Sequence, residues 1–222
     1  MDNSIYITLS RQLALFRDMD ATANNIANAN TTGYSTEHIN FRSYLVRDIN
    51  QGSTNQMAFA HDISSYRNNQ DGPLKTTDNP LDVAINGRGY FAVQTPLGIR
   101  YTRAGSFQLS VDGTLINAQN YPVLDTANQP IIFPEDTTEV EIGTAGNIKV
   151  NGDDFGNLNV VQFDNEQLLE PAGDTLFMTD AQPKPADPEK VKVIHGVLEG
   201  SNVNAVKEMT HMIEVSRAVG ST

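Results

Sequence analysis

The chain has 222 residues and a formal net charge of −12, with no cysteine and no tryptophan. This length suits one domain of ordinary size with appendages. An acidic surface repels phosphate groups and anionic lipids, which argues against nucleic-acid or membrane-surface partners. The lack of cysteine excludes a disulfide scaffold, a thiolate zinc site and a cysteine nucleophile.

Targeting signals in the sequence indicate only a default compartment. No apolar run approaches the roughly 18 residues of a membrane span, so membrane insertion is not expected. The N-terminus lacks the basic region and the continuous apolar run of a cleaved signal peptide. On these signals alone the expected compartment is the cytoplasm. Export would need a route that does not read such a peptide.

The first 33 residues predict a long helix with a narrow apolar seam. The seam comprises Ile5, Leu9, Phe16, Met19, Ala23 and Ile26. Their heptad spacing is typical of coiled coils, because a helix lying on its own core usually shows a wider apolar face. We expect about 25 residues of helix, and Gly33 to close the region in a left-handed conformation. One helix cannot bury such a seam alone, so a partner is needed.

A second amphipathic helix is predicted at the other end of the chain. Asn204 is its expected N-cap. Val206, Met209 and Ile213 continue a three–four alternation, and Val203 widens it. The two terminal helices are expected to pack together. The simpler interpretation is that this contact, or one with the domain between them, satisfies both seams.

Residues 34–73 predict an extended connecting arm. Their apolar residues alternate only weakly and then become sparse, so the arm has no core of its own. Such an arm is ordered only if it docks on something else.

Residues 74–180 predict an all-β domain, a sandwich or small barrel. Leu81–Ile85 and Tyr90–Val93 flank Asn86-Gly87, which predicts a tight hairpin turn between them. Further strands are expected at Ile99–Arg103, Phe107–Val111, Thr114–Asn117, Pro122–Leu124, Ile131–Phe133, Val140–Ile142, Ile148–Val150, Leu158–Phe163 and Thr175–Met178. Turn signals recur about every 8 to 12 residues, the spacing of such folds.

The remaining chain predicts a linker and the second helix. Residues 182–189 hold three prolines, which indicates a stiff linker, and residues 191–198 predict an extended segment. Residues 181–198 are therefore assigned to linker and residues 199–222 to the C-terminal helix. The expected fold class is α+β, with coiled-coil-like terminal helices packed together and an inserted all-β domain.

No stretch predicts a catalytic, metal or cofactor site. Gly87 to Ala92 fits G-x-G-x-x-A, but a nucleotide loop must open a helix and this segment is strand-like. Asn151 to Gly156 concentrates acidic residues, but the alternation and the terminal glutamate of a calcium loop are missing, so we expect a turn. The four histidines are scattered, and no nucleophile motif accompanies them.

The asparagine-rich end of the first helix is chemically unusual. Asn24, Asn25, Asn28 and Asn30 are poor helix formers whose amides donate and accept hydrogen bonds. One interpretation is a frayed helix end followed by a loop. The other is that these amides bind neighbouring chains and fix register, as buried polar residues do in coiled coils.

Three stretches resemble the bacterial flagellar axial proteins of the rod and hook family. Ala23-Asn-Asn-Ile-Ala-Asn-Ala-Asn-Thr-Thr-Gly-Tyr34 is similar to the family's N-terminal signature. Residues 79–91 with Tyr101-Thr-Arg-Ala-Gly-Ser-Phe107 resemble its central β segment. Leu198-Glu-Gly-Ser-Asn-Val-Asn204 and residues 212–218 resemble its C-terminal signature. The resemblance runs from end to end, with three motifs in order.

The resemblance implies a non-enzymatic structural subunit of the basal-body rod, without cofactors. It implies export through the flagellar type III apparatus and helical polymerisation across the periplasm. The expected partners are other copies of the chain, other rod proteins and the export apparatus. Expected subunit contacts are Ile5, Leu9, Phe16, Met19, Ala23, Asn24, Asn25, Ile26, Asn28, Asn30, Thr31, Gly33, Val203, Val206, Met209 and Ile213.

Alternatives remain at this point. The residues fit a proximal rod subunit best, with a distal rod or hook subunit as the nearest alternatives. A different reading is a β domain that binds carbohydrate or peptide, with ends that only oligomerise it. Tyr90, Phe91, Tyr101 and Phe107 would then line its site. The C-terminal helix is also expected to be shorter than is usual in the family, which would weaken assembly.

Overall fold

The computed structural model describes the backbone of residues 2–47 and 56–221, and the side chains of residues 8–40 and 65–221. The chain divides into two compact units. Unit 1 comprises Met1–Ala29, Ser35–Asn68 and Val203–Thr222, and unit 2 comprises Asn30–Tyr34 and Asn69–Asn202.

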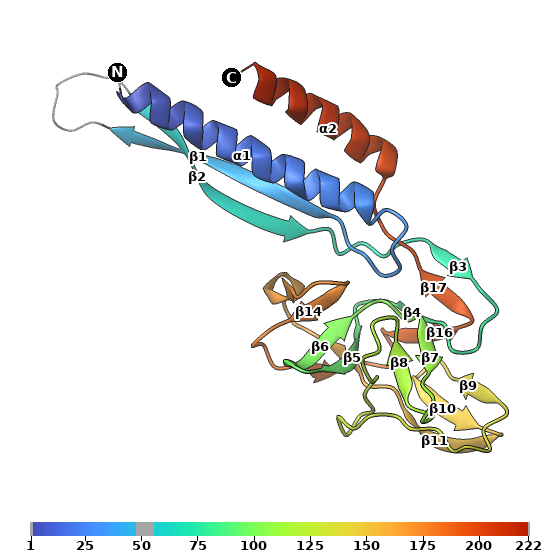
Figure 1. Ribbon diagram of the computed structural model, residues 1–222. Helices are drawn as coiled ribbons and strands as arrows, with labels where there is room; N and C mark the ends of the chain where they lie inside the picture. Colours follow the sequence, from blue (N-terminus) through green and yellow to red (C-terminus); the bar gives the residue numbers. More distant parts are fainter. Residues whose placement is uncertain (1, 48–55, 222) are drawn as a thin grey trace. The chain divides into compact units, whose positions relative to one another are not determined.

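Unit 1 consists of two helices and a β-hairpin (Figure 1). Its elements are α1 (Asp2–Ala27), β1 (Glu37–Arg47), β2 (Gln56–Arg67) and α2 (Ala205–Gly220). The 26 residues of α1 confirm the length predicted from the heptad pattern. Helix α1 contacts both α2 and the hairpin, so it is the central element of this unit.

The second helix begins where the sequence predicts. The Asn204 side chain accepts a hydrogen bond from the Lys207 N–H at 3.1 Å and so caps α2. Glu208 in the first turn and Arg217 in the last place charges that favour the helix dipole. None of the described helices is long and apolar enough to cross a membrane.

The segment predicted as an extended arm is paired. β1 and β2 form an antiparallel hairpin, with Glu37 opposite Arg67 and Arg47 opposite Gln56, and the register shifts between Phe41 and Ser43. A two-stranded hairpin is marginal alone in water. Contacts of both strands with α1 supply the packing that the arm lacks in its own sequence.

Unit 2 is built of short strands and one 3₁₀ turn. They are β3 (Leu74–Thr76), β4 (Val83–Asn86), β5 (Tyr90–Thr95), β6 (Gly98–Thr102), β7 (Phe107–Leu109), β8 (Leu115–Asn117), β9 (Val140–Ile142), β10 (Asn147–Val150), β11 (Asp153–Asn157), β12 (Val160–Gln162), η1 (Glu166–Leu168), β13 (Glu170–Pro171), β14 (Leu176–Met178), β15 (Lys184–Pro185), β16 (Lys192–His195) and β17 (Val197–Glu199). With the helices of unit 1, they confirm the predicted α+β class.

Antiparallel pairing organises these strands into several small sheets. The largest has the order β13-β14-β6-β5-β12-β15, and a second has the order β11-β10-β9. The pairs β16-β4, β17-β3 and β7-β8 complete the unit. The segments predicted as strands at Pro122–Leu124 and Ile131–Phe133 form isolated bridges instead.

Strand β5 shows how the core is arranged. Alternate residues of a strand point to opposite faces of its sheet. Phe91 and Val93 belong to one buried cluster, and Tyr90 and Ala92 belong to another. Apolar groups therefore cover both faces of the six-stranded sheet, which places β5 in the centre of unit 2.

The predicted hairpin at Asn86-Gly87 is wrong. β4 pairs with β16, whereas β5 pairs with β6 and β12. A tight type I′ turn needs positive φ at both central residues, and only Gly87 has it, at +104°. The loop is wide because it surrounds the buried Arg103 side chain, whose Nη1 donates to the carbonyl oxygens of Gly87 and Gly89.

Two other predicted turns are confirmed. Gly113, with φ of +76°, lies between β7 and β8, and Asp112-Gly113 joins these paired strands. Asn151 and Gly152 have φ of +52° and +92° and connect β10 to β11. The acidic stretch after Asn151 is therefore a turn and an edge strand.

The proline-rich segment is not a linker. Lys184–Pro185 forms the edge strand β15, which pairs with β12. Proline is tolerated there because an edge strand needs hydrogen-bond donors on one side only. The next strands, β16 and β17, pair with β4 and β3, so these residues belong to the body of unit 2.

Candidate assembly surface on the terminal helices

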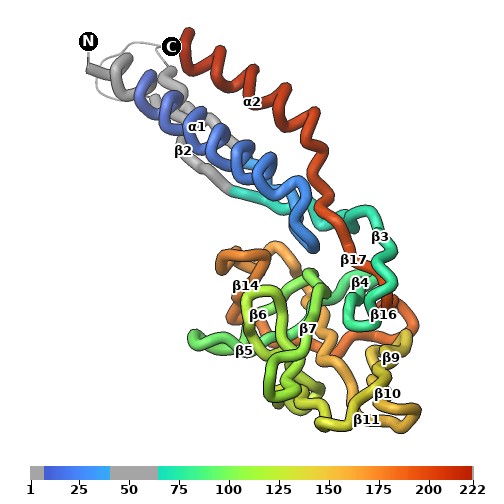
Figure 2. The backbone as a smooth tube through the Cα atoms, turned by 45° about the vertical axis from the view of Figure 1, so that its right-hand side comes forward, coloured from blue at the N-terminus to red at the C-terminus, as the bar shows by residue number. Residues whose placement is uncertain are grey.

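The two terminal helices pack together within unit 1, as predicted (Figure 2). The packed faces are small. On α1, Ala14 and Thr22 are 5% and 2% exposed, and on α2, Val215 is 4% exposed. The Thr22 hydroxyl donates to the Asp18 carbonyl at 2.8 Å, which satisfies this buried polar group.

Asn25 joins three elements of unit 1. Its Nδ2 donates to the Glu37 carbonyl oxygen at 2.8 Å and to Oε2 of Glu208 at 3.0 Å. Its Oδ1 accepts from the Glu37 N–H at 3.0 Å. One buried amide therefore fixes α1 against β1 and α2, and a charged acceptor strengthens the bond to α2.

A second polar contact joins the helices nearer the solvent. Nε2 of His211 lies 3.1 Å and 3.2 Å from the two carboxylate oxygens of Asp18. His211 is on α2 and Asp18 is on α1, so the pair aligns the two helices along their shared face. Exposure of His211 to solvent keeps its energetic value small.

Each helix also exposes an apolar stripe on another face. The α1 stripe consists of Leu9, Leu13 and Phe16, which are 49%, 54% and 43% exposed. The α2 stripe consists of Val206, Met209 and Ile213, which are 70%, 47% and 53% exposed. At about 3.6 residues per turn, each stripe lies well away from the buried residues of its own helix.

The predicted contact residues have different environments. Leu9, Phe16, Ala23, Asn24, Asn30, Val206, Met209 and Ile213 are exposed, Met19, Ile26, Asn28, Thr31 and Val203 are half-buried, and Asn25 and Gly33 are buried. Ile5 lies in α1, but its side chain is outside the described residues. The stripes therefore contain five members of the predicted set: Leu9, Phe16, Val206, Met209 and Ile213.

Two predicted contact residues are buried within the chain. Asn25 is 1% exposed and its amide is already hydrogen-bonded to Glu37 and Glu208, so it has no free surface for another copy. Gly33 has the predicted left-handed conformation, with a φ of +67°, but it lies six residues beyond the end of α1 at Ala27. It lies against the backbone of Arg103 and Ala104, where a Cβ atom would fall 2.4 Å from the Ala104 nitrogen.

Sequence reasoning missed the charged centre of unit 2. Arg103 is 6% exposed and Glu199 is 4% exposed, and Arg103 Nε donates to Glu199 Oε2 at 2.8 Å. Burial alone would lower the pKa of Arg103, but the charges of Glu199 and Asp71 outweigh it and raise the pKa. Arg103 and Glu199 lie within two of the stretches that resemble the rod and hook family, Tyr101–Phe107 and Leu198–Asn204. That position was the only signal in the sequence that these two charges matter.

The two motif-like stretches do not have the geometry of a nucleotide loop or a metal site in the described part of the chain. The G-x-G-x-x-A stretch runs into strand β5, so no helix N-terminus faces a phosphate. Among the described residues, no group of three or more histidine, aspartate or glutamate side chains is placed to hold a metal ion. The acidic turn at Asn151 accordingly carries no metal-site geometry.

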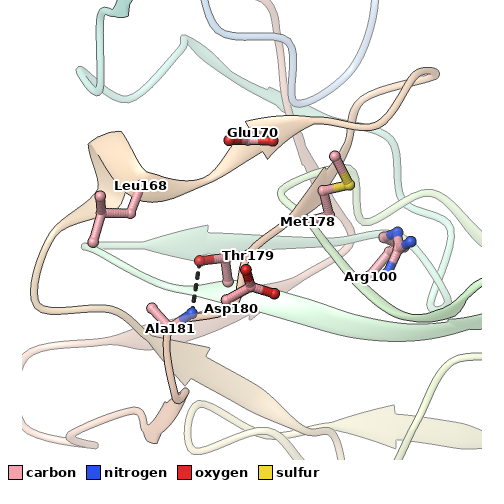
Figure 3. A pocket seen from close by; sticks show the side chains of 7 residues that line it. All are labelled: Arg100, Leu168, Glu170, Met178, Thr179, Asp180 and Ala181. Atoms are coloured by element: carbon pink, nitrogen blue, oxygen red, sulfur yellow. Dashed lines mark hydrogen bonds between the residues drawn. The ribbon is translucent and has the colours of Figure 1, made fainter.

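The carbohydrate- or peptide-binding reading loses its proposed site. Tyr90, Phe91, Tyr101 and Phe107 are all at most 8% exposed and form the core. A cavity of about 560 Å³ opens on unit 2 (Figure 3). It lies between the stretch from η1 to β13, which carries Leu168 and Glu170, and the segment from Met178 to Ala181. Its lining residues include no aromatic ring, so it offers no stacking platform for a sugar.

Three family descriptions match successive parts of the chain. Residues 5–34 match "Flagella basal body rod protein", residues 84–150 match "Flagellar hook protein FlgE/F/G D1 domain", and residues 194–219 match "Flagellar basal body rod FlgEFG protein C-terminal". All three describe one class of protein, the rod and hook proteins of the bacterial flagellum.

Curated relatives cover the whole chain. The flagellar basal-body rod protein FlgF of Caulobacter vibrioides is 35% identical over all of this chain and 91% of its own length. FlgF of Mesorhizobium japonicum is 34% identical with the same coverage. FlgG of Agrobacterium fabrum is 36% identical over 90% of this chain and 85% of its own. The chain therefore belongs to the flagellar basal-body rod protein family, as a structural rod component and not an enzyme.

Proposed function

We propose that copies of this chain assemble with one another and with other rod proteins through the α1 and α2 stripes. The observation that carries the proposal is the exposure of six apolar side chains in two helical stripes. A monomer gains nothing from leaving such stripes in water, because each buried aliphatic side chain is worth about 1.5–3 kcal/mol. Contacts between copies would remove them from water.

The stripes fit a polymer better than a closed dimer. A contact between two different surfaces repeats indefinitely unless its rotation closes a ring. Each copy offers two separate stripes, on α1 and on α2, and the packed faces of both helices are already used inside the chain. Each stripe can therefore meet a different neighbour, which supports helical growth.

The distribution of charge also favours unit 1 as the part of the chain that packs against other copies. Unit 1 has almost equal numbers of acidic and basic residues, so nearly all of the net charge of −12 lies in unit 2. Like charges repel in a crowded assembly, and an almost neutral surface packs against copies of itself at the least electrostatic cost. Unit 1 is therefore the better candidate for the close-packed part of the rod.

The full-length similarity to FlgF proteins supports a place in the proximal rod, with delivery by the flagellar type III export apparatus. The alternative is a distal rod or hook position. Similarity to FlgG proteins at comparable identity favours that alternative, over a smaller share of the chain.

The test replaces one residue in each stripe with glutamate. The Phe16→Glu and Ile213→Glu variants place a carboxylate in a surface that would lose its water when copies associate. Burying that charge without a partner is costly, so the association constant should fall by about tenfold or more. Lys207→Glu is the matched control, because it places the same side chain on the exposed polar face of α2. Sedimentation of the purified chain and motility of cells carrying each variant are measured.

The expected result is loss of sedimenting assemblies and of motility in both stripe variants, with the control unchanged. Circular dichroism should show equal helix content in all three variants, since the replaced side chains are exposed. Normal assembly and motility with glutamate in both stripes would show that other surfaces hold the rod together.

A further inference from the structure

The turn between β5 and β6 presents an isolated leucine on a rigid tip. Leu97 is 84% exposed. The Thr95 hydroxyl donates to the Gly98 carbonyl at 2.7 Å and accepts from the Leu97 N–H at 3.3 Å. Pro96 has a fixed φ, and Gly98 takes a φ of +105° that side chains rarely adopt. The leucine is thus held in one place before any contact forms.

A small apolar cavity lies elsewhere on unit 2, beside strands β10 and β11. Its volume is about 220 Å³, more than one leucine side chain occupies. Ile131 and Ile148 line it and are 5% and 1% exposed, whereas Ile132 and Phe155 are 56% and 40% exposed. The exposed pair leaves apolar surface in water beside the cavity, whose lining also includes Asp125 and Asn157.

The leucine tip and the cavity lie at opposite ends of unit 2. In both Figure 1 and Figure 2, the β5–β6 turn is at one side of the unit and the β9–β11 sheet is at the other. A single copy therefore cannot fill its own cavity with its own tip. Two copies can do so, and each then still offers a free tip or a free cavity.

The charges at the two ends are complementary. Residues 83–111 contain no aspartate or glutamate, and Arg100 lies on β6, three residues after Leu97. The cavity end carries Asp125 in its lining and the exposed Asp153 and Asp154 on β11, and these outnumber the half-buried Lys149 opposite Asp154. Unit 2 has a large negative charge, so most contacts between two copies of it would be repulsive. Contact between the tip of one copy and the cavity end of the next is attractive.

We propose that Leu97 of one copy inserts into the cavity lined by Ile131, Ile132, Ile148 and Phe155 of the next copy. The proposal rests on the proposed function, since it names a second contact between copies that associate. The contact is head-to-tail, so it repeats along a filament unless its rotation closes a ring. It gives unit 2 a directional role in an assembly whose main apolar surface lies in unit 1.

The larger cavity of Figure 3 is the rival receptor for the leucine. Its lining combines Leu168 and Met178 with Arg100, Glu170 and Asp180. Inserting a leucine there would remove three charged groups from water, against one, Asp125, in the smaller cavity, and desolvating charges is costly. Arg100 also lies on the same hairpin as the tip, so two copies would bring like charges together. These features favour the smaller cavity.

Disulfide trapping tests the contact directly, because the natural chain contains no cysteine. Leu97→Cys chains are mixed with Ile132→Cys chains, allowed to associate and then oxidised. The matched rival mixes Leu97→Cys with Leu168→Cys, whose parent leucine is also 56% exposed. The expected result is a mixed disulfide between positions 97 and 132 in the sedimenting fraction, and none between positions 97 and 168.

Each other outcome has a distinct meaning. A mixed disulfide to position 168, disulfides between identical variants only, or no disulfide in chains that do sediment would overturn this proposal and leave the proposed function standing. Failure of the cysteine variants and the natural chain alike to associate would overturn both.

A second pair of variants tests the energetics without cysteine. Leu97→Ser removes the inserted group, and Gly156→Val narrows the mouth of the cavity, where an added Cβ meets no atom within 4 Å. Each should raise the concentration needed for assembly by about tenfold, which corresponds to the free energy lost when one leucine side chain is no longer buried. Leu168→Ser is the control and should change nothing. Equal assembly by all three variants would contradict the proposal.

Discussion

Arg103 Nε donates to Glu199 Oε2 at 2.8 Å, and this buried pair joins residues 96 positions apart in the sequence. Arg103 Nη2 also donates to Asp71 at 2.8 Å. The other Glu199 carboxylate oxygen, Oε1, accepts from the Gly72 N–H at 3.0 Å, and its backbone carbonyl accepts from the Gly33 N–H at 2.9 Å. The three sequence signatures of the family therefore meet within unit 2, at one ion pair.

Replacing Arg103 with lysine should destabilise the protein although the charge is kept. Lysine cannot reproduce the several donors of the planar guanidinium group. Carbonyl oxygens of the 85–89 loop and a carboxylate partner of Arg103 would therefore lose their donors in a buried site. We expect a loss of about 3 kcal/mol in the free energy of unfolding, measured by urea titration. Arg88→Lys in the same loop is the control, because Arg88 is exposed, and should change stability by less than about 0.5 kcal/mol.

The pH dependence of that loss has a defined sign. The pKa of Arg103 is raised in the folded protein, so the stability that its charge provides is present at neutral pH. It is lost only as pH rises through the raised pKa, in strongly alkaline solution. The difference between Arg103→Lys and the natural chain should therefore stay constant between about pH 6 and pH 9. A difference that shrinks with pH in this window would contradict the assignment.

The two Asn-Gly pairs show how far sequence reasoning reaches. Asn151-Gly152 connects paired strands, with positive φ at both residues, as the local signal predicts. Asn86-Gly87 carries the same signal but opens around Arg103, a residue 16 positions from Gly87. Local turn chemistry is visible in a sequence, whereas a buried guanidinium that competes for the same carbonyls becomes visible only when the chain is folded.

The helices were more predictable than the strand partners. Heptad spacing located the α1 stripe residues Leu9 and Phe16, because periodicity depends only on one element. Pairing of β15 with β12, or of β1 with β2, joins segments whose sequences carry no local sign of each other. Among the candidate site residues, reasoning from side-chain chemistry assigned Asn25 to a neighbour, since an inward-facing amide and an outward-facing one look alike in a sequence.

Alanine at position 33 should disrupt unit 2. Gly33 has a φ of +67°, and a Cβ there would lie 2.4 Å from the Ala104 nitrogen and 2.6 Å from the Arg103 carbonyl carbon. Strain and displaced backbone together should cost about 2–3 kcal/mol, measured by thermal and urea unfolding. Gly156→Ala serves as the control, because its Cβ meets no atom within 4 Å, and should be neutral or slightly stabilising. Equal effects of the two substitutions would remove the close-approach argument.

Loss of the cap on α2 should weaken that helix alone. Asn204→Ala removes the side-chain oxygen that accepts from the Lys207 N–H at 3.1 Å. The expected cost is about 1 kcal/mol, and hydrogen exchange should speed up in the first turn of α2. Asn204→Asp keeps an acceptor and should retain most of the stability. Exchange that is unchanged in the alanine variant would show that the cap contributes nothing.

Aspartate in place of Asn25 should separate α2 from α1 in a pH-dependent way. The amide Nδ2 that now donates to Glu208 Oε2 at 3.0 Å would become a carboxylate oxygen, so two negative groups would face each other in a buried site. At neutral pH we expect a loss of about 3 kcal/mol or more, because one buried charge lacks a partner. As pH falls and a carboxyl group takes up a proton, a donor returns and the loss should shrink.

Asn24→Asp is the control: it adds the same charge one residue away on the exposed side of α1 and should cost less than about 0.5 kcal/mol at every pH. Unfolding followed by circular dichroism at several pH values measures both variants. A loss for Asn25→Asp that is equally large in acid would mean that the backbone bonds to Glu37, and not the contact with Glu208, hold this residue in place.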